Sequence, residues 1–348
     1  RLATLAHERN SCFVIDRGVG EAALGAIENY ISAHQIGDPE CVLTLPGGEE
    51  LKNGFAQVVP VLEHFERNRL DRKGKVFVVG GGALLDMAAF AATMYHRGLD
   101  YVRIPTTLLA QVDAGIGTKC GVNFWGQKNC LGFFKPPQAV LIDPNFLMTL
   151  PQRHLRSGLA EVLKIAAIKH RELFDRLESA HHLIFARDFA CADARYLIWE
   201  TICAHLDQIM LDPYENKTAR PLDFGHWSAH KLEQISNYRW RHGEAVSIGI
   251  SLDSTYAYLS GMLGESDWKR IITLFESLEL PVYADELATA RSPETGRLVV
   301  LDGLNEFREH LGGELTIMLL HGIGQGVEVH EMDEARIIES IEMLRQRS

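Results

Sequence analysis

Three histidines lie within seventeen positions of one segment, and histidine is a common zinc ligand. His226 and His230 are four residues apart, and His242 follows twelve residues later. If residues 222–235 form a helix, Asp223, His226 and His230 face the same way. His242 would then begin the next helix and could converge on the same point. A single histidine in such a motif is more often structural, so the interpretation rests on the cluster.

A glutamate earlier in the chain could complete a metal site. SGLAEVLKIAAIKH, residues 157–170, has the pattern of a helix on which Glu161 and Lys164 share a face. The neighbouring residues are apolar, so the carboxylate is either ion-paired or a ligand. Glu161 with two of the histidines would form a three-ligand Zn²⁺ site that leaves a position open for a substrate. A simple surface ion pair with Lys164 is the alternative.

Two glycine turns could bind a nucleotide. The three glycines at 80–82 follow a strand-like run and open a helical pattern, where backbone N–H groups can approach a pyrophosphate. Asp86, one turn into that helix, could contact a ribose or sit near the positive helix end. In LPGGEELK, residues 45–52, Glu49 and Lys52 could bind adenosine or simply begin a helix. A tight structural turn is as good an interpretation of the three glycines.

The stretch 105–129 is unusually polar and glycine-rich for the middle of an α/β domain. Lysines beside glycines and asparagines suit a phosphate-binding cradle. Composition alone slightly favours a solvated loop. The polar residues in this stretch are Asp113, Lys119, Asn123, Lys128 and Asn129.

Composition limits the class of protein. The chain has 348 residues, of which 46% are hydrophobic and 23% charged, values typical of a soluble globular protein with two domains. A net charge of −11 argues against nucleic acid or an anionic membrane as a partner. The apolar runs are too short to span a membrane. Six cysteines without regular spacing indicate reduced thiols, and we expect a cytoplasmic protein.

Alternating strand and helix patterns predict an α/β fold for residues 1–150, with a parallel sheet covered on both faces. Residues 151–348 are dominated by helical patterns, and strand-like sequence is rare until 315–320. We therefore expect a nucleotide-binding α/β domain followed by a mainly helical domain. The expected strands are 11–16, 41–45, 75–80, 101–105 and 139–143; the expected helices are 20–34, 51–68, 83–95, 155–178, 190–211, 222–235, 243–262 and 266–278.

Several of these motifs occur together in one family. The chain resembles dehydroquinate synthase and its relatives, the sugar phosphate cyclases, in order from about residue 40 to 260. The segments that carry the resemblance are GGGALLDMAAFAATMYHRGLDYVRIPTTLLAQVDAGIGTKCGVN, GQKNCLGFFKPP, GLAEVLKIAAIKH, DFGHWSAH and RHGEAVSIGI. The resemblance implies an NAD-binding α/β domain, a helical metal- and substrate-binding domain, NAD and Zn²⁺ (or Co²⁺) as cofactors, and a homodimer.

The resemblance also assigns residues. It places the metal on Glu161, His226 and His242, and makes His230 a substrate or phosphate contact. Arg97 matches an arginine that family members donate across the dimer interface to the substrate phosphate. The other positions matching the substrate pocket are Asp113, Lys119, Lys128, Asn129, Lys164, Arg220 and Asp223; those matching the NAD site are Asp16, Glu49, Lys52, Gly81, Gly82, Asp86, Thr106 and Thr107, with Lys119 and Lys128.

The implied reaction is a cyclisation of a sugar phosphate with loss of phosphate. NAD⁺ transiently oxidises one carbinol, phosphate leaves by β-elimination, the ketone is reduced again, and an intramolecular aldol step closes the ring. Positioning and charge stabilisation would be the main tasks of the protein.

The chain departs from dehydroquinate synthase where that enzyme holds a substrate carboxylate. His205 and Asp207 stand where a lysine is expected, and Arg220 matches only with a gap. Asp223 replaces an asparagine and Trp227 a threonine, while Arg308 is the nearest cation in the segment 303–317. Losing a cation and gaining a carboxylate disfavours a carboxylate on the substrate.

We therefore expect a cyclase nearer to the 2-epi-5-epi-valiolone synthases, which act on sedoheptulose 7-phosphate, than to dehydroquinate synthase. Those cyclases often carry proline where this chain has His230, so a separate branch from bacterial secondary-metabolite clusters is a further alternative. Dehydroquinate synthase itself, a metal-dependent polyol or alcohol dehydrogenase, and a silent cofactor-binding scaffold are the competing hypotheses.

Overall fold

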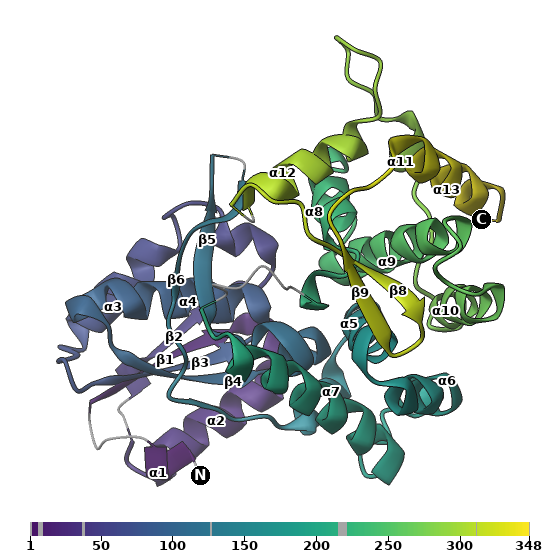
Figure 1. Cartoon of the computed structure of the whole chain (residues 1–348). Helices are drawn as coiled ribbons and strands as arrows, with labels where there is room; N and C mark the ends of the chain where they lie inside the picture. Colours follow the sequence, from purple (N-terminus) through teal and green to yellow (C-terminus); the bar gives the residue numbers. More distant parts are fainter. Residues whose placement is uncertain are drawn as a thin grey trace. The chain divides into compact units, whose positions relative to one another are not determined.

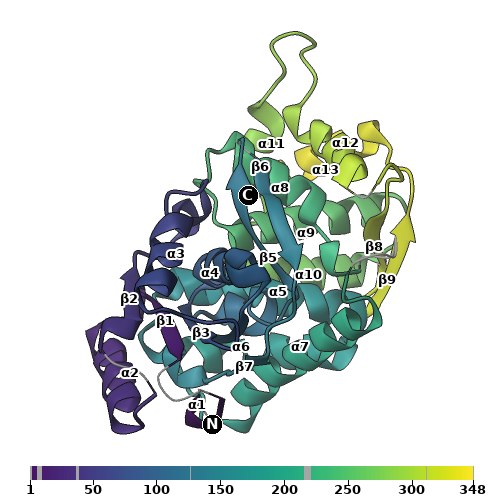
Figure 2. The ribbon, with the colours of Figure 1, turned by 90° about the vertical axis from the view of Figure 1, so that its left-hand side faces the viewer.

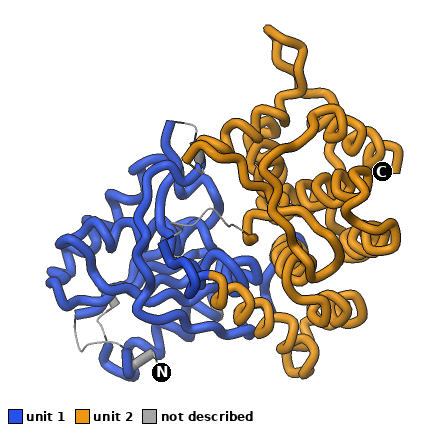
Figure 3. The backbone as a smooth tube through the Cα atoms, viewed as in Figure 1, with its two compact units in different colours: residues 1–154, 209–214 blue, residues 155–208, 215–348 orange. Residues whose placement is uncertain are grey.

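The computed structural model describes residues 2–5, 10–36, 39–125, 127–214, 221–310 and 312–347. The chain forms two compact units (Figure 3). Unit 1 comprises residues 1–154 with 209–214, and unit 2 comprises residues 155–208 with 215–348. The short segment 209–214 is held in unit 1 by Thr118, whose hydroxyl donates a 2.7 Å hydrogen bond to the Pro213 carbonyl.

A five-stranded parallel sheet forms the centre of unit 1. Its strand order is β2-β1-β3-β4-β7, and the neighbouring β2, β1 and β3 can be followed in Figure 2. The strands are β1 (Ser11–Asp16), β2 (Val42–Leu45), β3 (Lys75–Gly80), β4 (Asp100–Pro105) and β7 (Ala139–Val140). The fifth expected strand, 139–143, is thus paired only over its first two residues.

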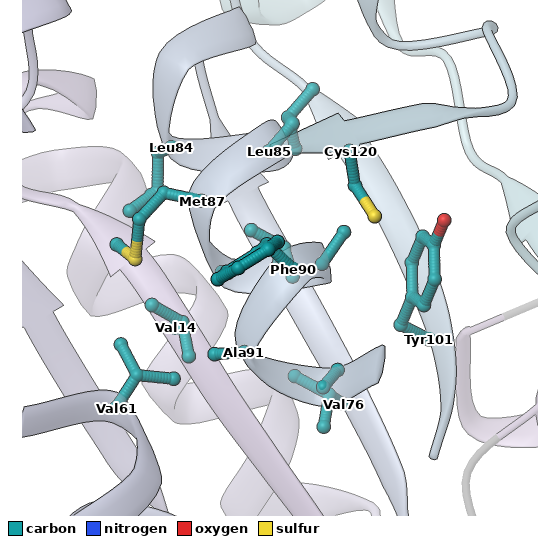
Figure 4. Close-up of a cluster of buried hydrophobic side chains, with 14 of the residues drawn as sticks. Val14, Val61, Val76, Leu84, Leu85, Met87, Phe90, Ala91, Tyr101 and Cys120 are labelled. Carbon is teal, nitrogen blue, oxygen red and sulfur yellow. The ribbon is translucent and has the colours of Figure 1, made fainter. Parts of the chain in front are cut away.

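Side chains of each strand alternate between two apolar layers. Cys12 and Val14 of β1 pack in a cluster with α3, α4 and β5, part of which is drawn in Figure 4. Phe13 and Ile15 of the same strand pack on the other face with residues of α2. Burial on both faces explains why these strands read as continuous apolar runs, and it confirms the expected parallel α/β domain.

The helices of unit 1 follow the expected pattern with one correction. In addition to the short α1 (Leu2–Leu5), they are α2 (Glu21–Ala33), α3 (Val58–Arg67) and α4 (Gly82–Met94). The helix expected over 51–68 begins only at Val58, after a 3₁₀ turn at Glu49–Lys52. Pro60 therefore lies in the first turn of α3, where a missing backbone N–H costs nothing.

The composition of the polar stretch 105–129 slightly favoured a solvated loop, but this prediction was wrong because the stretch contains regular elements. A short π-helix, Ala110–Ala114, is followed by an antiparallel pair, β5 (Lys119–Phe124) and β6 (Gln127–Phe134), which run side by side in Figure 1. Alternation in β5 places Cys120 and Val122 in the core, while β6 is largely exposed. The many glycines and polar residues obscured this alternation in the sequence.

Unit 2 is mainly helical, as expected. Its helices are α5 (Gln152–Lys169), α6 (Arg171–Phe185), α7 (Ala192–Leu211), α8 (His226–Ile235), α9 (His242–Leu259), α10 (Glu265–Ser277), α11 (Glu286–Thr289), α12 (Asp302–His310) and α13 (Glu334–Arg347). The first three residues of α5 and the last three of α7 belong to unit 1. An antiparallel hairpin, β8 (Ile317–Gly322) and β9 (Gln325–Val329), completes it.

Two expected helices of unit 2 have different limits. The helix expected over 155–178 is broken at His170, whose extended backbone ends α5 and whose Nδ1 accepts a hydrogen bond from the Leu173 N–H at the start of α6. The helix expected over 222–235 begins at His226, and Asp223 ends a 3₁₀ turn before it. The inference that Asp223 shares a helical face with His226 and His230 was therefore wrong.

Helix α9 runs through the interior of unit 2. It packs against α8, α10, α13 and β8, and fifteen consecutive residues from Gly243 to Ala257 are buried. Several of its buried hydroxyls donate hydrogen bonds within the helix or to a neighbour: Ser251 and Thr255 donate to carbonyls four residues earlier, and Ser247 donates to the Pro281 carbonyl. A helix with this burial is a rigid support for residues at its end.

Among the described residues, no helix is both long and apolar enough to cross a membrane. All six cysteines are free thiols, in agreement with the expectation that they are reduced.

Candidate metal centre and nucleotide site

Three predicted metal ligands from three helices of unit 2 meet at one point. Glu161 lies in the middle of α5, while His226 and His242 are the first residues of α8 and α9. One ligand atom from each residue lies within 4.8 Å of the others. Glu161 Oε1 is 4.0 Å from His226 Nε2 and 3.6 Å from His242 Nε2. One carboxylate oxygen and two imidazole nitrogens form a donor set that fits Zn²⁺ or Co²⁺.

Two glycines allow these helices to approach closely. A Cβ on Gly243, in the first turn of α9, would lie 2.1 Å from the Ser157 carbonyl oxygen of α5. Gly225, directly before α8, has a left-handed φ of 76°, and a Cβ there would lie 2.6 Å from the backbone nitrogen of Ile250 in α9. Any side chain at either position would push apart the helices that carry the candidate ligands.

The candidate glutamate ligand is buried beside a lysine. Glu161 is 1% exposed, and its Oε2 lies 2.5 Å from the Nζ of Lys164, which is 2% exposed. Burial alone would raise the pKa of the Glu161 carboxyl, but the Lys164 ammonium and the neighbouring imidazoles hold that pKa well below its usual range. Oε1 accepts no hydrogen bond among the described residues. An ionised oxygen is therefore available to a cation.

His226 is oriented by a backbone group. Its Nδ1 lies 3.0 Å from the Phe224 carbonyl oxygen, so the proton belongs on Nδ1 and the Nε2 lone pair faces Glu161. Burial and the charge of Lys164 lower the pKa of His226 to about 4. The imidazole is therefore neutral near pH 7, which is the form that binds a metal.

A second carboxylate lies on the other side of His242. Its Nδ1 is 3.4 Å from Oε1 of Glu233, a buried residue of α8 with 3% of its side chain exposed. Sequence reasoning did not single out Glu233. The signal was available, because Glu233 follows His226 by seven positions and His230 by three, the spacing of one helical face.

Of the other residues predicted near the metal, some lie in the same cluster and others do not. The ring centroid of His230 is 5.3 Å from that of His226 and 6.0 Å from that of His242, so it belongs to the same cluster. Trp227 is fully buried, and its indole N–H donates a 2.8 Å hydrogen bond to Asp253. This tryptophan therefore fills the core of unit 2. Arg220 lies outside the described residues.

The glycine turn of unit 1 is the second candidate site. Helix α4 begins at Gly82, directly after the end of β3, so its free N–H groups lie at the carboxyl edge of the sheet. A Cβ on Gly81 would lie 3.2 Å from Cγ2 of Thr107, and the Thr106 N–H donates to Gly80. The predicted residues Gly81, Gly82, Thr106 and Thr107 thus meet at one edge, the place where open α/β sheets bind ligands.

Five predicted cofactor and substrate residues are joined by ion pairs and hydrogen bonds. Lys52 Nζ lies 2.9 Å from Asp86 Oδ2 and also donates to the Asn129 side chain. Lys128 Nζ lies 3.8 Å from Glu49 Oε1. The 3₁₀ turn, α4 and β6 are therefore linked through charged side chains, although the turn and the hairpin lie far apart in the sequence.

The remaining predicted residues of unit 1 are placed separately. Asp16 ends β1, and its Oδ1 accepts a 2.7 Å hydrogen bond from the Gly18 N–H. Asp113 is half-buried in the π-helix, and Lys119 is exposed at the start of β5. Lys164, predicted for the same substrate pocket as Lys119, lies in unit 2 beside Glu161.

Arg103 is an organising residue that sequence reasoning missed. It is fully buried in β4, and its guanidinium donates to the carbonyls of Gly117 at 2.8 Å and Lys119 at 2.7 Å, with longer contacts to Ala114 and Gly115. Asp86 Oδ1 lies 3.5 Å from the same guanidinium. A charged residue inside the apolar strand YVRIP was the available signal, because a buried arginine requires partners.

Arg97 lies on an exposed turn after α4. Both His96 and Arg97 have left-handed backbone conformations, with φ of 49° and 69°. Such conformations are uncommon for residues other than glycine. The expected contact of Arg97 with a partner subunit stays a prediction.

Two family models match the chain. The model of the 3-dehydroquinate synthase N-terminal domain matches residues 42–157, and that of the C-terminal domain matches residues 158–295. Among similar curated proteins is a 2-epi-5-epi-valiolone synthase of Streptomyces hygroscopicus subsp. jinggangensis, 33% identical over 96% of this chain and 80% of the relative. A 3-dehydroquinate synthase of Nitrosospira multiformis is 34% identical over 96% of this chain and 88% of the relative.

Solved structures show the same similarity. The 2-epi-5-epi-valiolone synthase ValA from Streptomyces hygroscopicus, solved with NAD⁺ and Zn²⁺ bound, has a TM-score of 0.90 and 32% identity over 97% of this chain and 92% of its own. A 2-deoxy-scyllo-inosose synthase shares the fold, with a TM-score of 0.77 and 23% identity over 96% of this chain and 92% of its own. The chain therefore belongs to the 3-dehydroquinate synthase family of sugar phosphate cyclases.

Proposed function

We propose that this protein converts a ketose phosphate, sedoheptulose 7-phosphate, to a cyclitol ketone with loss of phosphate. The observation that carries the proposal is the cluster of Glu161, His226 and His242, which offers three ligand atoms and, within the described part of the chain, no fourth protein ligand in the same group. Three protein ligands are typical of catalytic metal sites, because a coordination position stays open for the substrate. ValA, which shares the fold and 32% identity, was solved with Zn²⁺ and NAD⁺.

The chemistry of the cofactors is the common part of this proposal. A divalent metal would acidify adjacent substrate hydroxyls, and NAD⁺ would accept a hydride and return it later in the same turnover. The residues of unit 2 supply the charge balance. Lys164 keeps Glu161 ionised, and the Phe224 carbonyl keeps Nε2 of His226 free of a proton. His230, beside both imidazoles, is in place to contact a substrate hydroxyl or phosphate oxygen.

The residues of unit 1 have a binding role in the proposal. The N–H groups at Gly81 and Gly82 would bind the pyrophosphate of NAD at the positive end of α4. Lys52 and Asp86 fix the 3₁₀ turn against α4 and so define one wall of that site. Asp16, Glu49, Thr106 and Thr107 would contact the rest of the dinucleotide. Asp113, Lys119, Lys128 and Asn129 would contact the substrate.

A substrate without a carboxylate is favoured by the charges on α7. His205 is buried and Asp207 is exposed at the positions where dehydroquinate synthase is expected to carry a lysine. Burial lowers the pKa of the nearby Lys169, and the charge of Asp207 raises it. No cation for a substrate carboxylate is therefore supplied by these two positions. A neutral polyol phosphate fits this charge pattern better.

The test is phosphate release by purified protein supplied with NAD⁺ and Zn²⁺ or Co²⁺. We expect release from sedoheptulose 7-phosphate that needs both cofactors and leaves no net NADH, with NMR identifying the cyclic product. Net NADH accumulation would instead indicate a polyol or alcohol dehydrogenase. Failure to release phosphate from C6–C8 ketose phosphates would refute the proposal.

3-Dehydroquinate synthase activity is the second candidate, because curated 3-dehydroquinate synthases are as similar as the valiolone synthases. Turnover of 3-deoxy-arabino-heptulosonate 7-phosphate would favour it and would contradict the argument from Asp207.

We also propose a homodimer in which Arg97 contributes to the substrate site of the partner. If so, mixing an Arg97→Ala variant with a Lys119→Ala variant restores part of the activity, because mixed dimers contain one intact site. Absence of complementation would indicate a site built from one chain.

A further inference from the structure

The two candidate imidazole ligands differ in what holds their second nitrogen. In His226, Nδ1 faces a neutral backbone carbonyl, that of Phe224, at 3.0 Å. In His242, Nδ1 faces the carboxylate of Glu233, with Oε1 at 3.4 Å. We propose that Glu233 is a positioning residue that orients His242 and raises the affinity of the centre for its divalent cation. This inference rests on the proposed metal centre and goes beyond it, because Glu233 is not one of its ligands.

The geometry fixes which nitrogen of His242 is available. Its Nε2 lies 3.6 Å from Glu161 Oε1, on the side of the other candidate ligands. Its Nδ1 lies on the opposite side of the ring, toward Glu233. A carboxylate next to Nδ1 stabilises the proton there, which leaves the lone pair of Nε2 for a metal. Glu233 therefore selects both the tautomer and the orientation of the ring.

The surroundings keep this carboxylate in place. Glu233 is buried, with 3% of its side chain exposed, and it is the eighth residue of the ten-residue helix α8. His226 begins the same helix, so a single element carries one candidate ligand and the residue that orients another. Because α8 and α9 are in close contact at Gly225, the distance between Glu233 and His242 is set by packing of the backbone.

Charge gives Glu233 a second effect. The Glu161 carboxylate is already paired with the Lys164 ammonium at 2.5 Å, so these two charges nearly cancel. A divalent cation placed beside them would meet little net negative charge from this pair, and the buried ammonium repels it. An ionised Glu233 carboxylate would supply additional negative charge on the far side of His242, from a side chain that is only 3% exposed.

A second metal position is the competing interpretation. His230, Glu233 and His242 also offer ligand atoms within 4.8 Å of one another. Both groups use His242, and a neutral imidazole has only one nitrogen lone pair to offer a metal. The 3.6 Å approach of Nε2 to Glu161 favours the first group for that lone pair, which leaves Glu233 the role of acceptor.

The test is the affinity and stoichiometry of Zn²⁺ binding by the full chain, measured by competition with a chelator. We expect one equivalent per chain for the unaltered protein. Glu233→Ala should weaken this binding by about 10- to 100-fold, the usual effect of removing a carboxylate that supports a metal-bound histidine. Glu233→Gln should give a smaller loss, because its amide oxygen can still accept from Nδ1–H but carries no charge.

Ser251→Ala is the matched control. Ser251 is fully buried in α9, and its hydroxyl donates only to the Ser247 carbonyl one turn earlier. This variant should lose a buried polar contact in the same helix without changing Zn²⁺ affinity. Thermal unfolding and circular dichroism of all variants separate a loss of affinity from a loss of structure.

The outcomes distinguish the inference from the proposed function. Unchanged Zn²⁺ affinity in both Glu233 variants would overturn the positioning role while leaving the metal centre intact. A second, weaker equivalent of Zn²⁺ that disappears in Glu233→Ala, with the first equivalent unaffected, would also overturn it and would identify a second cation site. Absence of Zn²⁺ binding by the unaltered protein would refute the metal centre and the inference together.

Discussion

The two candidate sites of this protein are built from different parts of the chain. The candidate metal centre of unit 2 consists of a buried carboxylate and two imidazoles, one buried and one half-buried, that project from α5, α8 and α9. The candidate nucleotide site of unit 1 consists largely of backbone, at the turn between β3 and α4, and Asp86 of α4 is ion-paired with Lys52 and Arg103. The metal centre should therefore be sensitive to single charges, and the nucleotide site to the shape of loops.

Loss of Glu161 should have the largest effect. Glu161→Ala removes the only carboxylate of the ligand group described by the structure and should reduce Zn²⁺ affinity beyond the ~100-fold that supporting residues contribute. It also leaves Lys164 buried without its ion-pair partner, which should lower the free energy of unfolding by about 3–5 kcal/mol. Chelator competition and denaturant unfolding measure the two effects.

A double variant separates the loss of Zn²⁺ affinity from the loss of stability. Glu161→Ala with Lys164→Met removes the uncompensated charge and should recover much of the lost stability without recovering Zn²⁺ affinity. If the double variant is no more stable than the single one, the buried ion pair is not the cause of the loss.

Gly243→Ala should damage the metal centre through packing. Its Cβ would lie 2.1 Å from the Ser157 carbonyl oxygen, so α9 must move relative to α5. We expect a loss of about 1–3 kcal/mol in unfolding free energy, together with weaker Zn²⁺ binding, because His242 moves with α9. Gly264→Ala, at an open position with no atom within 4 Å of the added Cβ, is the control. Normal Zn²⁺ affinity in the Gly243 variant would show that the centre tolerates helix movement.

Arg103→Met should affect the nucleotide site and spare the metal centre. It removes the donor shared by the carbonyls of Gly117 and Lys119, and the loss of a hydrogen bond from a charged group costs about 1.5–3 kcal/mol. Weaker NAD⁺ binding with unchanged Zn²⁺ affinity is the expected result, measured by calorimetry. Hydrogen exchange should show faster opening of residues 114–119. Equal losses at both sites would contradict the independence of the two sites.

Trp227→Phe should have the smallest effect on the free energy of unfolding, and the size of this effect should depend on pH. The indole N–H donates to Asp253, whose pKa burial raises to about 7. A carboxyl pKa raised on folding contributes stability at low pH that is lost as the pH rises through about 7. The indole stabilises the ionised form, so its removal should cost about 0.5–1.5 kcal/mol at about pH 8 and less at about pH 5. Equal losses at both pH values would exclude this role of the hydrogen bond.

Much of the fold followed from local pattern. Continuous apolar strands and glycine turns predicted the parallel sheet of unit 1, because strands buried on both faces must be apolar throughout. The hairpin of β5 and β6 did not follow, since its exposed strand lacks an apolar period. The break at His170 also escaped, because one backbone turn between two good helices leaves little trace in hydrophobic periodicity.

The candidate metal site was partly predictable. Histidine spacing and the resemblance to a family identified Glu161, His226 and His242, and their side chains do meet. Asp223 was misplaced, because the helix starts at His226, four residues after its expected start at residue 222. Glu233 lay on the predicted face of α8, but only its distance from His242 indicates a role.

The sequence by itself determined the types of chemistry: carboxylate and imidazole ligands, lysines for anions, and glycines where backbone must approach a ligand. Those are properties of residue types and short spacings. Tertiary structure alone decided which atoms face one another, because Glu161 lies in a helix far from His226 and His242 in the chain, and the three helices approach closely at Gly225 and Gly243. It also decided that Arg103 supports the loop carrying Lys119, since no local pattern connects a strand residue with carbonyls eleven to sixteen positions away.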